Sequence, residues 1–215
     1  NPSRLAAAAV VHPFPSLLNS GLVLVLALVA GGAIHVALGL ALAMLGLQLS
    51  IGAFNDYCDV TLDAVAKPAK PIPAGQVSRR TAALTGALAG GGGLALAAAF
   101  GAIELLLAAA MLGCGLAYDF ALKRGPLGWL CLAVALPLLP VFAWYGAAGV
   151  LPPRPELLLP LAALAGPALQ LANGLVDLER DEQVGVRGLA GWLGRRRTLA
   201  LMTLLQAAIH AIAWL

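Results

Sequence analysis

AIHVALGLALAMLGLQLSIGAFNDYCDVTLD, residues 33–63, joins an apolar run to a set of acids. The part from 33 to 54 contains no Asp, Glu, Lys or Arg. A run of about 17–25 apolar residues is long enough to cross a bilayer as a helix. The stretch therefore predicts a transmembrane helix that carries carboxylates where it leaves the lipid.

The rest of the chain has the same character. Of its 215 residues, 61% are hydrophobic and 11% are charged, whereas a soluble domain carries about 25% charged residues. Six further apolar runs are long enough to span a membrane: 16–31, 81–100, 102–118, 128–148, 156–176 and 198–215. We therefore expect an all-α integral membrane protein with seven spans in a helical bundle. The glycine run 90–93 is expected to allow close helix contact or a local bend.

Long charged connections alternate with short ones, which places the charged ones on one side of the membrane. The charged connections are residues 55–80, 119–127 and 177–197. With the amino terminus inside, 12 of the 13 Lys and Arg residues fall on the inner side, and only Arg154 falls outside. The positive-inside rule then predicts a multi-pass protein of the inner or plasma membrane, whose charged face is cytoplasmic. The acids collect there too, 8 of 10, and no topology rule explains that.

The acids contain a repeated pattern, N-x-x-x-D-x-x-x-D. Its members are Asn55, Asp59 and Asp63 in the first copy and Asn173, Asp177 and Asp181 in the second. Residues four apart share one face of a helix, so each copy predicts a column of one amide and two carboxylates. Both columns leave the membrane on the same side.

Such columns are unfavourable by themselves. Carboxylates four residues apart repel one another, and the carboxyl end of a helix disfavours anions. Divalent cations relieve both effects, and magnesium prefers carboxylate, water and phosphate oxygens. A single motif of this kind would most simply be a solvated helix end. Two matched copies favour a magnesium site.

Basic residues accompany the acids. The candidates are Lys67, Lys70, Lys123, Arg124 and Arg180. Each one alone is explained by topology or by contact with lipid headgroups. Together with the acids they predict a site for a polyanion such as a diphosphate, because Lys and Arg both bind phosphate.

These residues resemble the signatures of the UbiA prenyltransferase superfamily. The matching segments are Asn55-Asp56-x-x-Asp59-x-x-x-Asp63 followed by Lys67-Pro68-x-Lys70-Pro71, then Tyr118-x-x-x-Leu122-Lys123-Arg124, then Asp177-Leu-Glu-Arg-Asp181. They occur in the order and spacing of the family.

The resemblance implies a helical bundle around a central cavity. Magnesium would hold the diphosphate at the cytoplasmic end, on the two N-D-D motifs, and the prenyl tail would lie in the apolar interior near a lateral opening. Lys123 would hold the diphosphate with help from Lys70, at a position where the family commonly has Arg, and Tyr118 would line the reaction centre. The family usually has nine spans. We therefore expect residues 1–215 to form a single domain that either lacks the last two helices or belongs to a short member.

The implied reaction is transfer of a prenyl group from a prenyl diphosphate. Ionisation of the diphosphate is followed by attack of a lipid, alcohol or aromatic acceptor, and Asp56 or Asp63 is the expected proton acceptor. The first motif is closer to the chlorophyll-synthase and geranylgeranylglyceryl-phosphate branch than to members that act on hydroxybenzoates. Membrane lipid is an expected partner and nucleic acid is not, while the oligomeric state stays open.

Two alternatives remain from the sequence. One is a membrane terpene cyclase of the same superfamily, in which the allylic cation attacks its own chain. The other is a transporter or lipid-binding membrane protein that uses the acids for coupling. Acids occur at the rim of the predicted bundle and not at mid-depth, which disfavours a conducting path.

Overall fold

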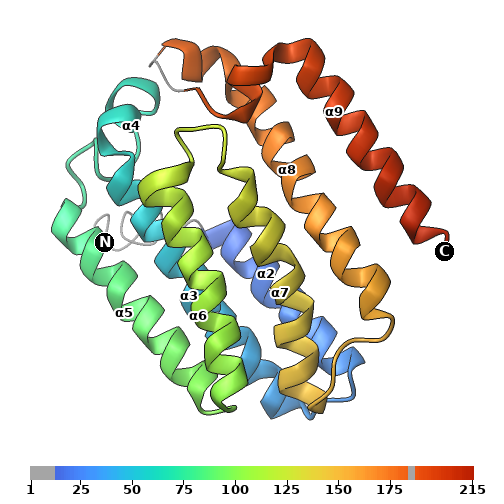
Figure 1. The fold of residues 1–215 in the computed structure, drawn as a ribbon. Helices are drawn as coiled ribbons and strands as arrows, with labels where there is room; N and C mark the ends of the chain where they lie inside the picture. The colour runs from blue at the N-terminus through green and yellow to red at the C-terminus, as the bar shows by residue number, and fades with distance from the viewer. Residues whose placement is uncertain (1–12, 184–186) are drawn as a thin grey trace.

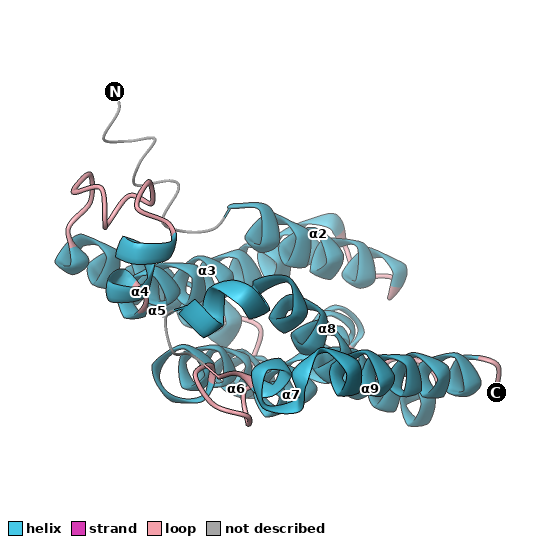
Figure 2. Cartoon of the chain, turned by 90° about the horizontal axis from the view of Figure 1, so that it is seen from above, coloured by secondary structure: helices cyan, strands magenta, loops and turns pink. Residues whose placement is uncertain are grey.

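The computed structural model describes residues 13–183 and 187–215, with the backbone alone for residues 180–183. Helices account for all regular structure in these residues (Figures 1 and 2). They are α2 (Pro13–Val29), α3 (Ile34–Cys58), α4 (Val60–Ala66), α5 (Arg79–Ala98), α6 (Ala102–Ala117), the π-helix η1 (Tyr118–Leu122), α7 (Trp129–Ala148), α8 (Pro155–Gln183) and α9 (Leu189–Ala213).

The all-helical prediction is confirmed, and a helix covers most of each of the seven expected runs, although α2, α5 and α9 end two residues before the predicted bounds. Five of these helices are long and apolar enough to cross a membrane: α3, α5, α6 with η1, α7 and α8. Helix α2 is apolar but has only 17 residues, and α9 carries three arginines, Arg195 to Arg197. The total of seven spans therefore stays a prediction.

Helix α3 is the centre of the bundle. It packs against α2, α5, α6 and α7, whereas α9 packs on α8 at the edge (Figure 1). Small and medium side chains of α3 fill the core, among them Ala37, Leu40, Ala43 and Met44, and they meet Phe142 of α7. One side of α3 is buried in this core, while Ile34, Leu38 and Leu42 remain exposed on the surface of the bundle.

The charged segments gather at one end of the bundle. Figure 1 places α4, η1 and the carboxyl end of α8 together, while the turns between α2 and α3, between α5 and α6 and between α7 and α8 lie at the opposite end. The two N-D-D motifs therefore emerge at the same end, which is the arrangement that a shared site requires.

The predicted connection 177–197 is shorter than expected from the sequence. Helix α8 continues to Gln183, so the second motif lies on helix, and α9 begins at Leu189. The arginines Arg195 to Arg197 are therefore helical, after a break at Gly194, where φ is 73°. A residue with a side chain rarely adopts that φ, so Gly194 allows the chain to turn into the long part of α9.

Helices α3 and α5 approach closely because small residues line their contact. A Cβ added to Gly46 of α3 would lie 2.8 Å from the carbonyl oxygen of Ala89 and 2.9 Å from the Cα of Gly93, both on α5. Gly90 likewise lies against Ser50. The expected close contact at the glycine run 90–93 is confirmed.

This contact predicts a specific sensitivity. Gly46→Ala should lower the free energy of unfolding by about 1–3 kcal/mol, because the added methyl group meets backbone that can only move apart. Gly91→Ala is the matched control, since nothing lies within 4 Å of its Cβ position. Unfolding in mixed micelles checks the difference, and equal stability of the two variants would contradict the close packing.

Candidate active site

The first motif lies where the central helix is interrupted. Helix α3 ends at Cys58, Asp59 has φ of −95° and ψ of 6°, and α4 begins at Val60. The break separates the carboxylates into two groups with different lysine partners. The three members of the first motif therefore do not form the single uniform column expected from the sequence.

Lys70 joins Asp56 and Asp63. Its Nζ lies 2.7 Å from Asp56 Oδ1 and 2.7 Å from Asp63 Oδ2, and both carboxylates are buried. Burial lowers the pKa of the Lys70 ammonium, but the hydrogen bonds to the two carboxylates raise it by more, so its pKa lies above the ordinary value. Lys70 is therefore charged at neutral pH and ties the segment after α4 to the end of α3.

Lys123 joins the first motif to the segment after α6. Its Nζ lies 2.8 Å from Asp59 Oδ2 and 3.4 Å from Asp119 Oδ1. Asp119 also accepts a hydrogen bond of 2.7 Å from the Asn55 side-chain amide. Arg124 donates to the Cys58 carbonyl at 3.0 Å, with its guanidinium 3.8 Å from Asp59. The amide and the first carboxylate of the motif thus face the segment after α6.

The π-helix η1 determines how that segment presents its side chains. The Lys123 amide bonds to the Tyr118 carbonyl, five residues earlier, at 2.9 Å. An i→i+5 bond widens the turn and brings residues five apart towards one face, which an α-helix does for residues four apart. Tyr118 and Lys123 therefore line the same pocket. The Tyr118 hydroxyl also accepts from Gln170 of α8 at 3.1 Å.

The second motif faces the same pocket from α8. Asn173 and Asp177 line a cavity of about 80 Å³, the rim pocket, together with Lys123 and Tyr118. Residues 188–191, the first turn of α9, close it. Because Lys123 also bonds to Asp59, it stands between the two motifs.

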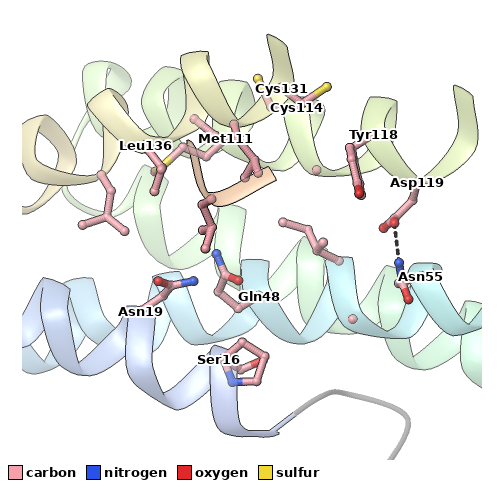
Figure 3. Close-up of a pocket in the computed structure, with 18 of the residues that line it drawn as sticks. Ser16, Asn19, Gln48, Asn55, Met111, Cys114, Tyr118, Asp119, Cys131 and Leu136 are labelled. Atoms are coloured by element: carbon pink, nitrogen blue, oxygen red, sulfur yellow. Dashed lines mark hydrogen bonds between the residues drawn. The ribbon is translucent and has the colours of Figure 1, made fainter. Parts of the chain in front are cut away.

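A larger cavity of about 360 Å³, the central pocket, lies next to the rim pocket. Tyr118, Gln170 and Asn173 line both cavities. The central pocket also contains Asn55 and Asp119, so one residue of each N-D-D motif, Asn55 and Asn173, borders the same space. Figure 3 shows Tyr118 and the hydrogen-bonded pair of Asn55 and Asp119 at one end of it, and Asn19, Gln48 and Met111 further in.

An apolar pocket of about 600 Å³ lies next to the central pocket, between α2, α7 and α8. Asn19, Leu136 and Leu139 line both. The apolar pocket reaches Trp144 of α7 and Arg154, which lies in the turn between α7 and α8. Figure 1 places that turn at the opposite end of the bundle. The structure therefore has a polar, charged end and an apolar path that leads away from it.

The donor set fits magnesium only with help from a substrate. No group of three or more His, Cys, Asp or Glu side chains that could hold a metal by themselves occurs among the described side chains, those of residues 13–179 and 187–215. Magnesium, however, is usually held by one or two carboxylates with water and substrate phosphate. The side chains of Asn55, Asp59, Asn173 and Asp177 supply oxygen donors of that kind.

Some predicted site residues lie away from these pockets or outside the described side chains. Lys67 is exposed, and no ion pair joins it to another described residue. The side chains of Arg180 and Asp181 lie outside the described residues. Asp56 and Asp63 line neither the rim nor the central pocket. A proton acceptor has to reach the substrate, so this placement favours a role in fixing Lys70.

Sequence reasoning did not assign Asp119 or Gln170 to the site. Gln170 carries no motif signal. Asp119 stands four residues before Lys123, a spacing that brings side chains together on a helix. The sequence therefore contained a signal that pairs Asp119 with Lys123. Asp119 is 3% exposed, whereas a charged residue in a predicted connection is ordinarily taken as solvated.

Residues 17–215 match the sequence model of the UbiA prenyltransferase family. A digeranylgeranylglyceryl phosphate synthase from Korarchaeum cryptofilum is 32% identical over 73% of this chain and 56% of its own length. Another from Pyrococcus abyssi is 32% identical over 78% and 60%. The chain thus spans little more than half the length of these two relatives. A third, from Halobacterium salinarum, is 33% identical over 88% and 70%.

The fold is also that of solved structures. A UbiA homolog from Archaeoglobus fulgidus bound to GPP and Mg2+ superimposes with a TM-score of 0.80 at 19% identity, over 96% of this chain and 76% of that one. At this identity the likeness concerns the fold alone.

Proposed function

The chain belongs to the UbiA prenyltransferase family, and we propose that it transfers a prenyl group from a prenyl diphosphate to an acceptor within the membrane. The observation that carries the proposal is the meeting of the two N-D-D motifs at one charged end of the bundle, where Asn55 and Asn173 border one pocket. That pocket shares Asn19, Leu136 and Leu139 with a neighbouring apolar pocket, which is suited to a hydrocarbon chain.

The diphosphate is proposed to lie at the rim pocket, between the two motifs. Lys123 lines this pocket and provides an ammonium there. The first-turn amides of α9 border it as well, and helix amino termini favour anions. Charge that develops on the leaving diphosphate is stabilised by such preorganised donors. Lys70 and Arg124 support the site by holding the carboxylates of the first motif, Asp63 and Asp59 respectively, and Lys67 and Arg180 remain proposed contacts.

Magnesium is the proposed cofactor. Asn55, Asp59, Asn173 and Asp177 are its proposed ligands nearest the pockets, and Asp63 and Asp181 extend the two motifs. When bound, the metal would neutralise the diphosphate and assist its departure. The related structure from Archaeoglobus fulgidus was solved with GPP and Mg2+, which supports this assignment.

The prenyl tail is proposed to run through the central pocket into the apolar pocket. Tyr118 borders the charged end of this path, and its hydroxyl is oriented by Gln170. A ring at this position excludes water from the allylic carbon and places π-electrons beside a developing cation. Leu136 and Leu139 then line the passage towards Trp144.

The acceptor is proposed to be a prenylated glyceryl phosphate lipid. The three relatives carry the name digeranylgeranylglyceryl phosphate synthase, which names a product with two geranylgeranyl groups. The reaction then forms an ether bond between the acceptor oxygen and C1 of the prenyl group, and it releases diphosphate and a proton. We further propose that the charged end faces the cytoplasm, because the topology inferred from the sequence assigns 12 of 13 Lys and Arg residues to the inner side.

The deciding experiment measures diphosphate release by the purified chain in lipid nanodiscs. Prenyl diphosphates of 5 to 20 carbons are offered with geranylgeranylglyceryl phosphate, an isoprenoid alcohol or no acceptor. We expect release that requires magnesium and the glyceryl phosphate lipid, with formation of the ether. Release without acceptor and with a cyclic product would instead identify a terpene cyclase. No release, together with ion- or pH-linked flux, would identify a transporter.

The apolar pocket predicts how chain length is limited. Ala162→Phe fills part of this pocket, which Ala162 lines, and should lower kcat/KM for a 20-carbon diphosphate at least about tenfold. The value for a 5-carbon substrate should stay unchanged, because a short tail does not reach that far. Ala163→Phe, which lines none of the three pockets described above, is the control. A loss that is equal for both chain lengths would contradict this path.

A further inference from the structure

Asp119 is buried in the site without being one of its sequence motif residues. Asp119 belongs to η1, is only 3% exposed to solvent, and lines the central pocket. Oδ1 accepts from the Asn55 amide nitrogen at 2.7 Å and faces Lys123 Nζ at 3.4 Å. Oδ2 is buried with no hydrogen-bond partner among the described residues. A buried acceptor without a partner costs stability, so retaining it points to a role in function.

The contact with Asn55 determines which atom of that amide is available. An ionised carboxylate only accepts hydrogen bonds, so the nitrogen of Asn55 faces Asp119 and the oxygen is turned away. Figure 3 shows this orientation. Without a partner for its nitrogen, an amide can present either end. With Asp119 in place, Asn55 presents the oxygen, which is the end that a cation binds.

The contact with Lys123 has a similar effect. Lys123 reaches Asp59 at 2.8 Å and Asp119 at 3.4 Å, so its long side chain is held at two points. The side chain of Lys123 is 10% exposed. A lysine held in this way loses little further freedom when it contacts an anion at the rim pocket.

We propose that Asp119 is a positioning residue of the prenyl transfer site, which orients the Asn55 oxygen towards the divalent cation and holds Lys123 towards the diphosphate. This inference rests on the proposed function and adds a residue to it. Partners in the shell around metal ligands typically contribute 10–100-fold to metal affinity or activity. Removal of Asp119 should therefore weaken metal binding although Asp119 itself is not proposed as a ligand.

The test measures Mn2+ binding by electron paramagnetic resonance, beside magnesium-dependent diphosphate release and thermal unfolding. Asp119→Leu should weaken Mn2+ binding about 10–100-fold. Asn55→Asp alone should also weaken it, because two carboxylates would then stand where a 2.7 Å hydrogen bond is now. The double exchange Asn55→Asp with Asp119→Asn restores one donor and one acceptor with their roles reversed. It should bind Mn2+ more tightly than either Asn55→Asp or Asp119→Leu.

The matched control is Glu104→Gln. Glu104 is likewise a buried carboxyl without a hydrogen-bond partner among the described residues. It lies at the amino end of α6, roughly 22 Å from Asp119 along the helix. We expect wild-type Mn2+ affinity for Glu104→Gln.

The outcomes separate the two proposals. If the wild type binds Mn2+ and releases diphosphate but Asp119→Leu binds as tightly, only the positioning role is overturned. The same holds if the double exchange is no better than the single variants, because the hydrogen bond between residues 55 and 119 would then have no influence on metal binding. If the wild type neither binds Mn2+ nor releases diphosphate, the proposed function fails and the role of Asp119 with it.

Discussion

Asp59→Ala is expected to lower magnesium-dependent turnover by about 100–1,000-fold, the loss that follows removal of one preorganised charged group. The Asp59 carboxylate is the member of the first motif that contacts Lys123, at 2.8 Å. Removing it takes away a proposed metal ligand and one of the two contacts that hold Lys123. Both losses act on the departure of the diphosphate, and so they should appear in kcat as well as in metal affinity.

The fold should survive this substitution. Asp59 stands at the amino cap of α4, but its side chain makes no capping hydrogen bond. Thermal unfolding should therefore change little while activity is lost. Glu156→Ala is the control, because Glu156 is 67% exposed and its ion pair with Arg154 is 3.9 Å long, a kind of pair that contributes little. Full activity of Asp59→Ala would refute the proposed metal site.

Lys123→Met should separate metal binding from catalysis. Met keeps the length and apolar stem of the side chain but removes the ammonium. Turnover should fall about 100-fold or more, because stabilisation of the developing diphosphate charge is lost at the rim pocket. Mn2+ affinity should be retained or should increase, since the ammonium no longer competes for the Asp59 carboxylate.

The measurements are single-turnover diphosphate release and Mn2+ titration on the same preparation. Arg196→Met serves as the control, because it also removes one positive charge, at an exposed position of α9. A fall in metal affinity that matches the fall in rate would contradict a separate role for Lys123. Stability should also decrease, because Asp119 would stay buried with the Asn55 amide as its one remaining hydrogen-bond partner among the described residues.

The two variants together test whether Asp59 and Lys123 have different roles in the site. Asp59→Ala should lower both the affinity for the metal and the turnover rate, whereas Lys123→Met should lower only the turnover rate. If Asp59 and Lys123 act through their shared contact, the double variant should lose less turnover than the product of the two single losses. Substitutions at residues in contact do not have independent effects.

The helical segments, and the charged residues at their ends, could be predicted from the sequence alone. In lipid each backbone polar group has to be satisfied within its own segment, so an apolar run of sufficient length determines a helix by local sequence alone. The seven runs, the charged connections and the two N-D-D motifs are local features of this kind. They also carry the resemblance to the UbiA prenyltransferase family, whose sequence model residues 17–215 match.

The arrangement inside the site could not be read in this way. The pairing of Lys70 with Asp56 and Asp63, and of Lys123 with Asp59, depends on the break at Asp59 and on the i→i+5 turn of η1. Helical periodicity predicts a uniform column for the first motif. A local change in helix type alters which side chains share a face, and no spacing rule for α-helices reports that change.

The sequence by itself determined the membrane class, the helices and the residue types that could bind metal and diphosphate, because each depends on interactions between residues close in the chain. The tertiary structure alone decided that Asn55 meets Asp119, 64 residues away, and that α3, η1 and α8 enclose one pocket. Contacts between distant segments depend on how helices pack side by side, and packing is set by the shapes of many side chains together.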